Sequence, residues 1–355
     1  MNYKVKLVAV AKDESAYLAD WVQHHLYYGF SEIDIYINRT SDDSVTLLEN
    51  IKKKCRQVNY FIADWIDQLP PPSRKNLQHI CYMQALKNLD KDITHVLFLD
   101  IDEYWVSKKY ITINQYLEAC DKKQDLTVFE WFNEGAVSEA FLAIPKTLSG
   151  KYHPLGKSMI RVSSINKIKQ IRLHVPSLHE NSTILLADGT VFKPQPNLPQ
   201  HVANNLNSLK HTFIFHRMFR SETEYLASLY RGNPEEDFPI KLNRNGYGYS
   251  DTDKLDSHEF KTQDYERYIQ SKNSFMEFCE LNELIQNSHE LILNNSNKLK
   301  FVLAELLLKR PNEVTRVLKN IKDTDIIDLF SGAEKKETSN PVSFKSRVLN
   351  RIKKI

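Results

Sequence analysis

The stretch that decides the fold is Thr94-His-Val-Leu-Phe-Leu-Asp-Ile-Asp-Glu-Tyr104, in which a short apolar run ends abruptly in carboxylates. An uninterrupted apolar run, rather than an alternating one, is typical of a parallel strand that helices cover on both faces. In open α/β sheets, ligands gather beyond the carboxyl ends of the strands. Asp100 and Asp102, spaced i and i+2, could share a hard divalent cation with a substrate diphosphate there. We therefore expect a site at the end of this strand.

The sequence before this run predicts alternating strands and helices. Apolar spacing predicts strands over residues 4–10, 33–37, 58–62 and 96–99, and helices over residues 15–28, 44–54 and 75–89. Polar turn and cap residues separate these segments. The order predicts an α/β fold with a Rossmann-like, mostly parallel sheet, right-handed crossovers and helices on both faces.

After Tyr104 the pattern is mixed. It predicts a helix over 112–121, a strand over 126–132, irregular chain to about 205, a strand over 211–216 and a helix from Glu222 to the Gly and Pro near 232. Residues 255–330 are helical by periodicity. We therefore expect a first domain over residues 1–235, a helical region over 236–330 and a polar linker with a basic tail over 331–355.

Composition narrows the class of protein. Of the 355 residues, 41% are hydrophobic and 26% are charged, which argues against a disordered or a membrane-spanning chain. The net charge of +3 is too small to indicate nucleic-acid binding. The four cysteines are widely spaced and form no metal-ligand or disulfide pattern. The first residues lack the long apolar core of a secretory signal, so we expect a cytoplasmic location.

The last twenty residues carry an excess of basic side chains. Phe344, Val348, Leu349, Ile352 and Ile355 fall near one helical face, and lysines and arginines fall elsewhere. This pattern predicts peripheral contact with the inner face of a membrane, where anionic lipid attracts such a segment. A dimerisation helix or a disordered solubilising end would explain the same pattern.

Glycine usage bears on how a phosphate could be held. The chain has nine glycines, and none forms GxGxxG after the first strand or GxxxxGK[ST] anywhere. Dinucleotide-binding Rossmann enzymes and P-loop NTPases use these glycines to cradle phosphates with backbone N–H groups. A cation, Mn²⁺ or Mg²⁺, held by Asp100 and Asp102 is the available substitute.

Several blocks resemble, in order, the GT-A glycosyltransferases, in particular the bacterial family-2-like group related to glycosyltransferase family 92. The matching blocks are Ala11-Lys-Asp-Glu14 with Asp20-Trp21, His25 and Gly29; Ile35-Tyr-Ile-Asn38 with Ser41-Asp-Asp-Ser44; Phe98-Leu-Asp-Ile-Asp-Glu-Tyr104; Trp131-Phe-Asn-Glu-Gly135; Lys157-Ser158; His174-Val-Pro176; and His216 with Ser221, Glu224, Arg231 and Gly232. The resemblance covers about residues 5–235. The chain departs from the group's pattern at Asp13, Asn38, Asn133-Glu134 and Arg217.

The resemblance implies a metal site and a donor site at one sheet edge. The implied metal ligands are Asp100, Asp102 and His216. Residues expected to bind the nucleotide sugar are Lys12, Asp13, Glu14, Asp42, Asp43, Arg74, Gln78, Asp100, Lys157 and Arg231. Turn and N-cap duties explain several of these residue types equally well. Glu103 is either an outer contact of the site or the start of a helix.

Catalysis with inversion requires a base that takes the proton of the acceptor hydroxyl. Glu134, beside Trp131, is the leading candidate for this base, and Glu130 and Asp237 are the alternatives. Asp102 would act in catalysis through the metal. No HExxH or GxSxG motif indicates a zinc protease or an acyl hydrolase.

These features predict a metal-dependent, inverting glycosyltransferase. The donor would be a nucleoside-diphosphate sugar, UDP-linked by preference. The acceptor would be a hydroxyl of a surface glycan of the lipopolysaccharide or capsule type, free or lipid-linked. Two alternatives stay open: a non-catalytic carbohydrate-binding or assembly protein on the same fold, and a nucleotidyltransferase.

Overall fold

A computed structural model describes residues 3–203, 211–231, 240–250 and 252–328. The chain divides into two compact units. The first comprises Met1–Glu134, Ala143–Met218 and Leu255–Ser288. The second comprises Gly135–Leu142, Phe219–Lys254 and His289–Ile355.

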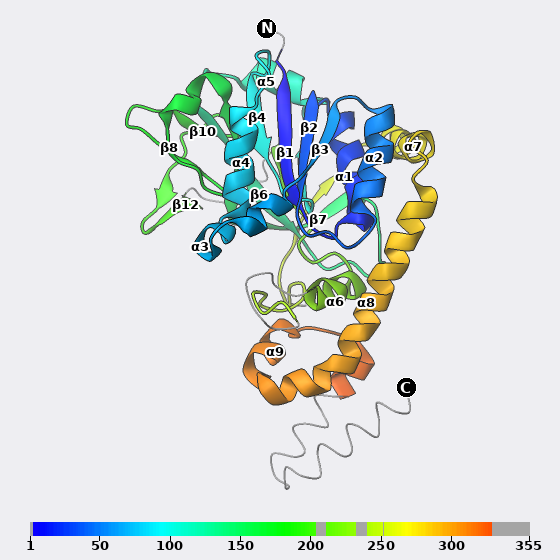
Figure 1. The fold of residues 1–355 in the computed structure, drawn as a ribbon. Coiled ribbons are helices and arrows are strands. Elements are labelled where there is room, and N and C mark those ends of the chain that lie inside the picture. Colours follow the sequence, from blue (N-terminus) through cyan, green and yellow to red (C-terminus); the bar gives the residue numbers. More distant parts are fainter. Residues whose placement is uncertain (1–2, 204–210, 232–239, 251, 329–355) are drawn as a thin grey trace. The chain divides into compact units, whose positions relative to one another are not determined.

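The first unit is built on a ten-stranded sheet (Figure 1). Eight strands follow one another in the order β3-β2-β1-β4-β7-β6-β13-β5, while β10 pairs with β6 and β14 pairs with β7. The strands are β1 (Val5–Ala11), β2 (Glu32–Ile37), β3 (Val58–Ile62), β4 (His95–Phe98), β5 (Glu103–Ser107), β6 (Leu126–Glu134), β7 (Thr147–Arg161), β10 (Ile184–Leu186), β13 (Thr212–His216) and β14 (Asp256–Glu259). Strands β3, β2, β1 and β4 run parallel, β7 runs antiparallel to β4 and β6, and β5 runs antiparallel to β13. Two small sheets pair β8 (Ile168–Gln170) with β9 (Ser177–Leu178) and β11 (Pro194–Gln195) with β12 (Leu198–Val202).

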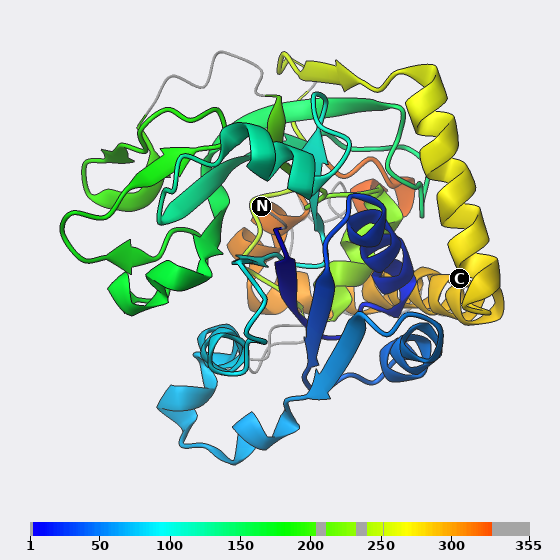
Figure 2. The ribbon, with the colours of Figure 1, turned by 90° about the horizontal axis from the view of Figure 1, so that it is seen from above.

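Helices cover both faces of the parallel part. Viewed along the strands, α1 (Ser15–Tyr27) and α2 (Ser44–Lys54) lie on one side of β1 and β2, and α4 (Leu77–Lys87) lies on the other (Figure 2). Leu7 and Ala9 belong to the core under α1 and α2, whereas Val8 belongs to the core under α4. The remaining helices of this unit are α5 (Ile113–Cys120), α7 (Thr262–Phe278), the short α3 (Pro71–Arg74), and the 3₁₀ turns η1 (Asp64–Gln68) and η2 (Val162–Lys167). The predicted α/β class, with a mostly parallel sheet between helices, is confirmed.

The sequence predicts irregular chain up to about residue 205, and this prediction is wrong for residues 147–161. Strand β7 runs for 15 residues and pairs with β4 on one side and β6 on the other. Gly150, His153, Pro154 and Gly156 break the alternation that would have indicated a strand. The pairing of β7 with β6 shifts in register between Glu130, which lies opposite Gly156, and Trp131, which lies opposite His153. This shift marks a β-bulge in β7.

Gly156 is required by the close approach of β6 and β7. A Cβ atom added there would lie 2.1 Å from the carbonyl oxygen of Phe129, a backbone atom that cannot move aside. We expect Gly156→Ala to lower the free energy of unfolding by about 3 kcal/mol, as measured by urea unfolding. The comparison variant is Gly189→Ala in a turn, where the methyl group would meet only the flexible end of Lys122. There the positive φ of 83° should cost about 1 kcal/mol. Equal losses in the two variants would contradict the clash.

The second unit contains α6 (Glu222–Tyr230), α9 (Pro311–Val317) and the part of α8 (Asn282–Lys309) that follows Ser288. A capping box starts α6, because Ser221 and Glu224 each bond the other's backbone N–H. Tyr225 donates a hydrogen bond of 2.7 Å to the carbonyl of Val317, which ties α6 to α9. The predicted helix after Ser221 is therefore confirmed.

The chain returns to the first unit after residue 254. Strand β14 pairs antiparallel with β7, and α7 packs on α1, so that unit does not end at residue 235 as the sequence suggests. The predicted linker and basic tail, residues 331–355, lie outside the described residues. In the part of the chain that is described, no helix is both long and apolar enough to cross a membrane.

Candidate active site

The acidic run forms a tight turn between β4 and β5. The N–H of Glu103 donates to the carbonyl of Asp100 (3.0 Å), and the N–H of Asp100 donates to the Glu103 side chain (2.9 Å). The indole N–H of Trp21, from α1, lies 3.0 Å from the carbonyl of Asp100 and 2.8 Å from that of Glu103. Glu103 begins a strand rather than a helix, and its buried side chain braces the turn. Asp100 and Asp102 are thereby fixed at the carboxyl end of β4.

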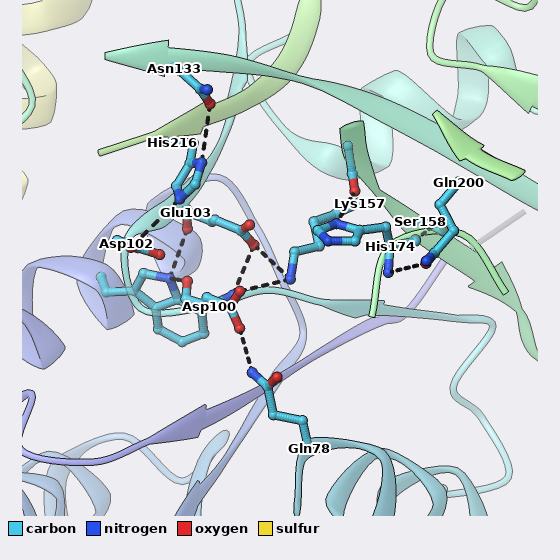
Figure 3. A network of polar contacts seen from close by, with 12 residues as sticks. Gln78, Asp100, Asp102, Glu103, Asn133, Lys157, Ser158, His174, Gln200 and His216 are labelled. Atoms are coloured by element: carbon cyan, nitrogen blue, oxygen red, sulfur yellow. Dashed lines mark hydrogen bonds and ion pairs between the residues drawn. The ribbon is translucent and has the colours of Figure 1, made fainter. Parts of the chain in front are cut away.

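A buried lysine neutralises the acids on one side of the turn (Figure 3). Lys157 of β7 places its Nζ 2.9 Å from Asp100 Oδ2 and 3.2 Å from Glu103 Oε2. Its side chain is 1% exposed, and that of Glu103 is 0% exposed. Burial alone would lower the pKa of Lys157, but the charges of Asp100 and Glu103 outweigh burial and raise this pKa well above its ordinary value. Lys157 is therefore a fixed internal cation. Burial raises the pKa of Glu103, although the charge of Lys157 opposes that shift.

Gln78, for which the sequence predicts contact with the nucleotide sugar, lies beside Asp100. Its Nε2 donates to Asp100 Oδ1 at 2.9 Å, so each oxygen of this carboxylate has a protein partner. Arg74 does not join them in the described structure. It lies exposed in α3, and its Nε donates to the carbonyl of Leu69 at 2.7 Å.

The other side of the turn holds a histidine next to Asp102. His216, the last residue of β13, places Nε2 3.6 Å from Asp102 Oδ2. Its Nδ1 lies 3.1 Å from Asn133 Oδ1, so Nδ1 carries the proton that Asn133 accepts. In the neutral ring, the Nε2 lone pair then faces Asp102. The ring of Trp131 lies 4.3 Å from the His216 ring, centroid to centroid, and restricts its rotation.

The residues fit a divalent cation, but with a smaller ligand set than predicted. Asp102 and a histidine whose Nδ1–H is already bonded are suitable ligands, and hard cations often take one or two protein ligands plus substrate phosphates and water. Asp100 is less suited than predicted, because Lys157 and Gln78 already bond its two oxygens. Accordingly, no cluster of three or more metal-binding side chains occurs among the described residues.

The loops after β1 and β2 are bonded to each other. Asp13 accepts hydrogen bonds from the N–H (2.7 Å) and hydroxyl (3.1 Å) of Ser41, while its own N–H donates to Thr40. Asp42 accepts from the N–H of Ser15 (2.8 Å), the first residue of α1. The turn and cap duties left open by the sequence are therefore present at Asp13 and Asp42. The predicted nucleotide contacts of these residues stay a prediction, as do those of Lys12, Glu14 and Asp43, which lie in the same two loops.

Two of the three candidate bases, Glu134 and Glu130, are buried. Glu134 is 2% exposed and accepts a hydrogen bond of 3.0 Å from Arg217 Nε. Glu130 is 1% exposed. A carboxylate held by a buried guanidinium is poorly placed to take a proton from an acceptor, so the arrangement favours a positioning role for Glu134. Asp237 lies outside the described residues. Arg231 belongs to the second unit, at the end of α6.

Sequence reasoning missed Asn133 and Trp21 as parts of this site. Asn133 follows the apolar run 126–132 at the carboxyl end of its strand, and that position was the available signal. Trp21 faces inward from α1 and gives no sign in the sequence that its N–H bonds the acidic turn.

Three buried histidines predict a loss of stability in acid. Burial lowers the pKa of His24 to about 3 and those of His95 and His258 to about 4. Unfolding lets each imidazole bind a proton at about pH 6.5, so stability should fall as the pH drops from 6.5 toward 4. Each residue shifted to pKa 4 contributes about 3 kcal/mol to this fall. Urea unfolding at pH 7 and pH 4.5 measures it. The fall in the free energy of unfolding between pH 7 and pH 4.5 should be smaller in His95→Asn and unchanged in the exposed His179→Asn. An equal fall in the two variants would rule out His95 as a source of the acid sensitivity.

Comparison with known proteins gives only distant structural neighbours. No protein family matches the sequence, and no curated protein does either. Similar solved structures include 4-diphosphocytidyl-2C-methyl-D-erythritol synthase from Anaerococcus prevotii (11% identity, TM-score 0.27, 45% of this chain and 71% of that one). Others are a mycobacterial protein (12%, 0.29, 47% and 56%) and S. aureus TarS (12%, 0.25, 46% and 29%). Each match covers less than half of this chain and, for the last two, less than two thirds of the other chain.

Proposed function

We propose that this protein is a metal-dependent, inverting glycosyltransferase that moves a sugar from a UDP-sugar to a hydroxyl of a surface glycan. The observation that carries the proposal is the pairing of Asp102 and His216 at the carboxyl ends of β4 and β13. Two metal-binding groups at a sheet edge without a glycine-rich phosphate loop suit a diphosphate that binds through a cation.

The side chains divide the work in this proposal. Asp102 and His216 hold Mn²⁺ or Mg²⁺, which would stabilise the charge that develops on the diphosphate leaving group. Asn133 keeps the proton of His216 on Nδ1, so that Nε2 is free to bind. Lys157 offsets part of the negative charge of Asp100 and Glu103, which weakens their repulsion of the diphosphate.

Two residues predicted to serve the acceptor, Trp131 and Glu134, are largely buried. Trp131 lies beside His216 and is 9% exposed, which leaves little ring surface for a sugar. The base for inversion is not assigned to Glu134, because that carboxylate is paired with Arg217. Attachment to the inner membrane face through residues 335–355 remains part of the proposal.

A thermal-shift screen of nucleotides and nucleotide sugars, with Mn²⁺ or with EDTA, tests the donor and the metal together. A ligand at 100 times its Kd stabilises the folded state by about 2.7 kcal/mol, so UDP with Mn²⁺ should raise the melting temperature by several degrees. His216→Ala should remove the part that depends on Mn²⁺, and the exposed His179→Ala should keep it. An equal UDP shift in EDTA would contradict the metal role.

Turnover assays then separate the enzyme classes. Release of UDP from a UDP-sugar in the presence of an acceptor glycan supports the proposal. Release of pyrophosphate from a nucleoside triphosphate would instead identify a nucleotidyltransferase. Binding of UDP with Mn²⁺ but with neither reaction would identify a non-catalytic binding protein.

A further inference from the structure

A second cavity lies in the first unit, away from the acidic turn. Its volume is about 420 Å³, within the range of small-molecule sites. It is lined by Ser107, the last residue of β5, and by Tyr28, which follows α1. The acidic turn lies at the other end of β5, because Glu103 is the first residue of this strand and Asp100 and Asp102 precede it. The loops that meet the start of α1 lie at the same edge. Five strand residues span about 13 Å and thirteen helix residues about 20 Å, so the cavity is distinct from the candidate active site.

Tyrosines form much of the wall, and two of them keep an unused hydroxyl. The five tyrosines that line the cavity are Tyr27, Tyr28, Tyr110, Tyr265 and Tyr268. Tyr265 donates to the carbonyl of Ile144 (3.1 Å), and the Tyr268 hydroxyl bonds His24 Nδ1 (3.2 Å). Tyr28 is only 7% exposed, yet its hydroxyl bonds to no residue in the described part of the chain. Tyr28 belongs to the wall of the cavity, so its hydroxyl is available to a ligand there.

Three lysines line the cavity, and one of them, Lys109, places its Nζ 5.3 Å from the centroid of the Tyr110 ring. The other two give the cavity an uncompensated positive charge. Among the charged residues of the wall, Arg267 is paired with Asp264 (2.6 Å), and Glu259 is paired with Lys146 (3.1 Å). Lys108 and Lys261 are exposed and lie within ion-pair distance of no carboxylate among the described residues. They come from opposite parts of the chain, the end of β5 and the start of α7, and both line the same cavity.

We propose that this cavity binds an anionic saccharide, a sugar that carries a carboxylate or a phosphate group. An apolar ligand would cover the hydroxyls of Tyr27 and Tyr28 without bonding them, which is costly on desolvation, and would make no use of the lysine charges. A bare inorganic anion would leave the aromatic wall unused. A sugar acid offers hydroxyls to Tyr27 and Tyr28, C–H faces to the rings and a negative group to Lys108 and Lys261. The proposal is independent of the chemistry at Asp102.

Titration by saturation-transfer NMR on the full chain tests this site. The probes are glucuronic acid, glucose 1-phosphate, glucose, inorganic phosphate and UMP. We expect the first two to bind at least about tenfold more tightly than glucose or phosphate. Lys108→Ala with Lys261→Ala should weaken them by about tenfold or more, whereas the exposed Lys53→Ala should change nothing. Tyr28→Phe should weaken them about threefold, and Tyr116→Phe, whose hydroxyl bonds the carbonyl of Ala187 instead, should not.

Several results would overturn the proposal. These are no binding of either acid at about 10 mM, equal binding of glucose or of phosphate, or binding that survives the double lysine substitution. UMP that binds more tightly than the sugar acids and displaces them would make this a nucleotide site instead. Asp102→Asn should leave all the affinities unchanged, so failure here is distinguishable from failure of the transferase proposal.

Discussion

Asp102→Asn is expected to lower sugar transfer by about 1,000-fold, because a neutral amide of the same size loses the charge that would hold the cation. Asparagine keeps the shape of the turn, and the carbonyl of Asp102 still accepts the N–H of Arg217 at 2.8 Å. The folded protein should therefore survive. The measurements are initial rates over a range of Mn²⁺ concentrations and the melting temperature without ligand.

Asp90→Asn is the matched control, because Asp90 is an exposed acid that precedes β4 and lies in no part of the site. Its rates should equal those of the unchanged protein. Full activity of Asp102→Asn, with the same Mn²⁺ dependence, would remove the metal role from this residue. A fall in melting temperature equal to that of a core substitution would instead assign it a structural role.

Lys157→Met should be the most destabilising substitution of a single charge, by about 3–5 kcal/mol near pH 8. It leaves Glu103, which is 0% exposed, as an uncompensated buried acid beside Asp100. The pKa of Glu103 is already raised by burial and would rise further without Lys157. A carboxyl group with a raised folded pKa gains stability as the pH falls below that value. The loss in Lys157→Met should therefore be smaller at pH 5 than at pH 8.

Urea unfolding of both proteins at the two pH values measures this effect, each pH being compared with the unchanged protein at that pH. Lys54→Met is the control, because Lys54 pairs with Glu280 at the surface, with side chains 37% and 74% exposed. It should cost at most about 1 kcal/mol at either pH. A loss in Lys157→Met that is the same at pH 5 and pH 8 would mean that packing, not charge, accounts for it.

Local sequence signals predicted the first half of the sheet well. The predicted spans 44–54 and 58–62 coincide with α2 and β3, because polar caps and apolar spacing mark their ends. The unbroken apolar run also predicted burial of β4 on both faces, and every residue of β4 is buried. The contact of Gln78 with Asp100 was not predicted, although Gln78 lies in the helix that precedes this strand.

Local sequence patterns did not predict contacts between segments that are far apart in the chain. Lys157 contacts Asp100 across 57 residues of sequence, through a strand whose glycines and proline hid it. The resemblance identified Lys157 as a site residue but gave no reason to pair it with the acids. Likewise, β5 follows directly on the acidic turn, where the carboxylates suggested a loop or a helix start. The return of α7 to the first unit depends on packing against α1, which periodicity alone does not reveal.

The bonds between the loops after β1 and β2 have a consequence for protein engineering. Asp13 and Ser41 link the two loops, and Asp42 of the second loop caps the helix that begins after the first. Asp13 also adopts a positive φ angle of 52°, which its bonds to Thr40 and Ser41 of the opposite loop help to maintain. A loop grafted alone from another protein would lose its partner's half of these bonds. The two loops should therefore be exchanged as a single cassette.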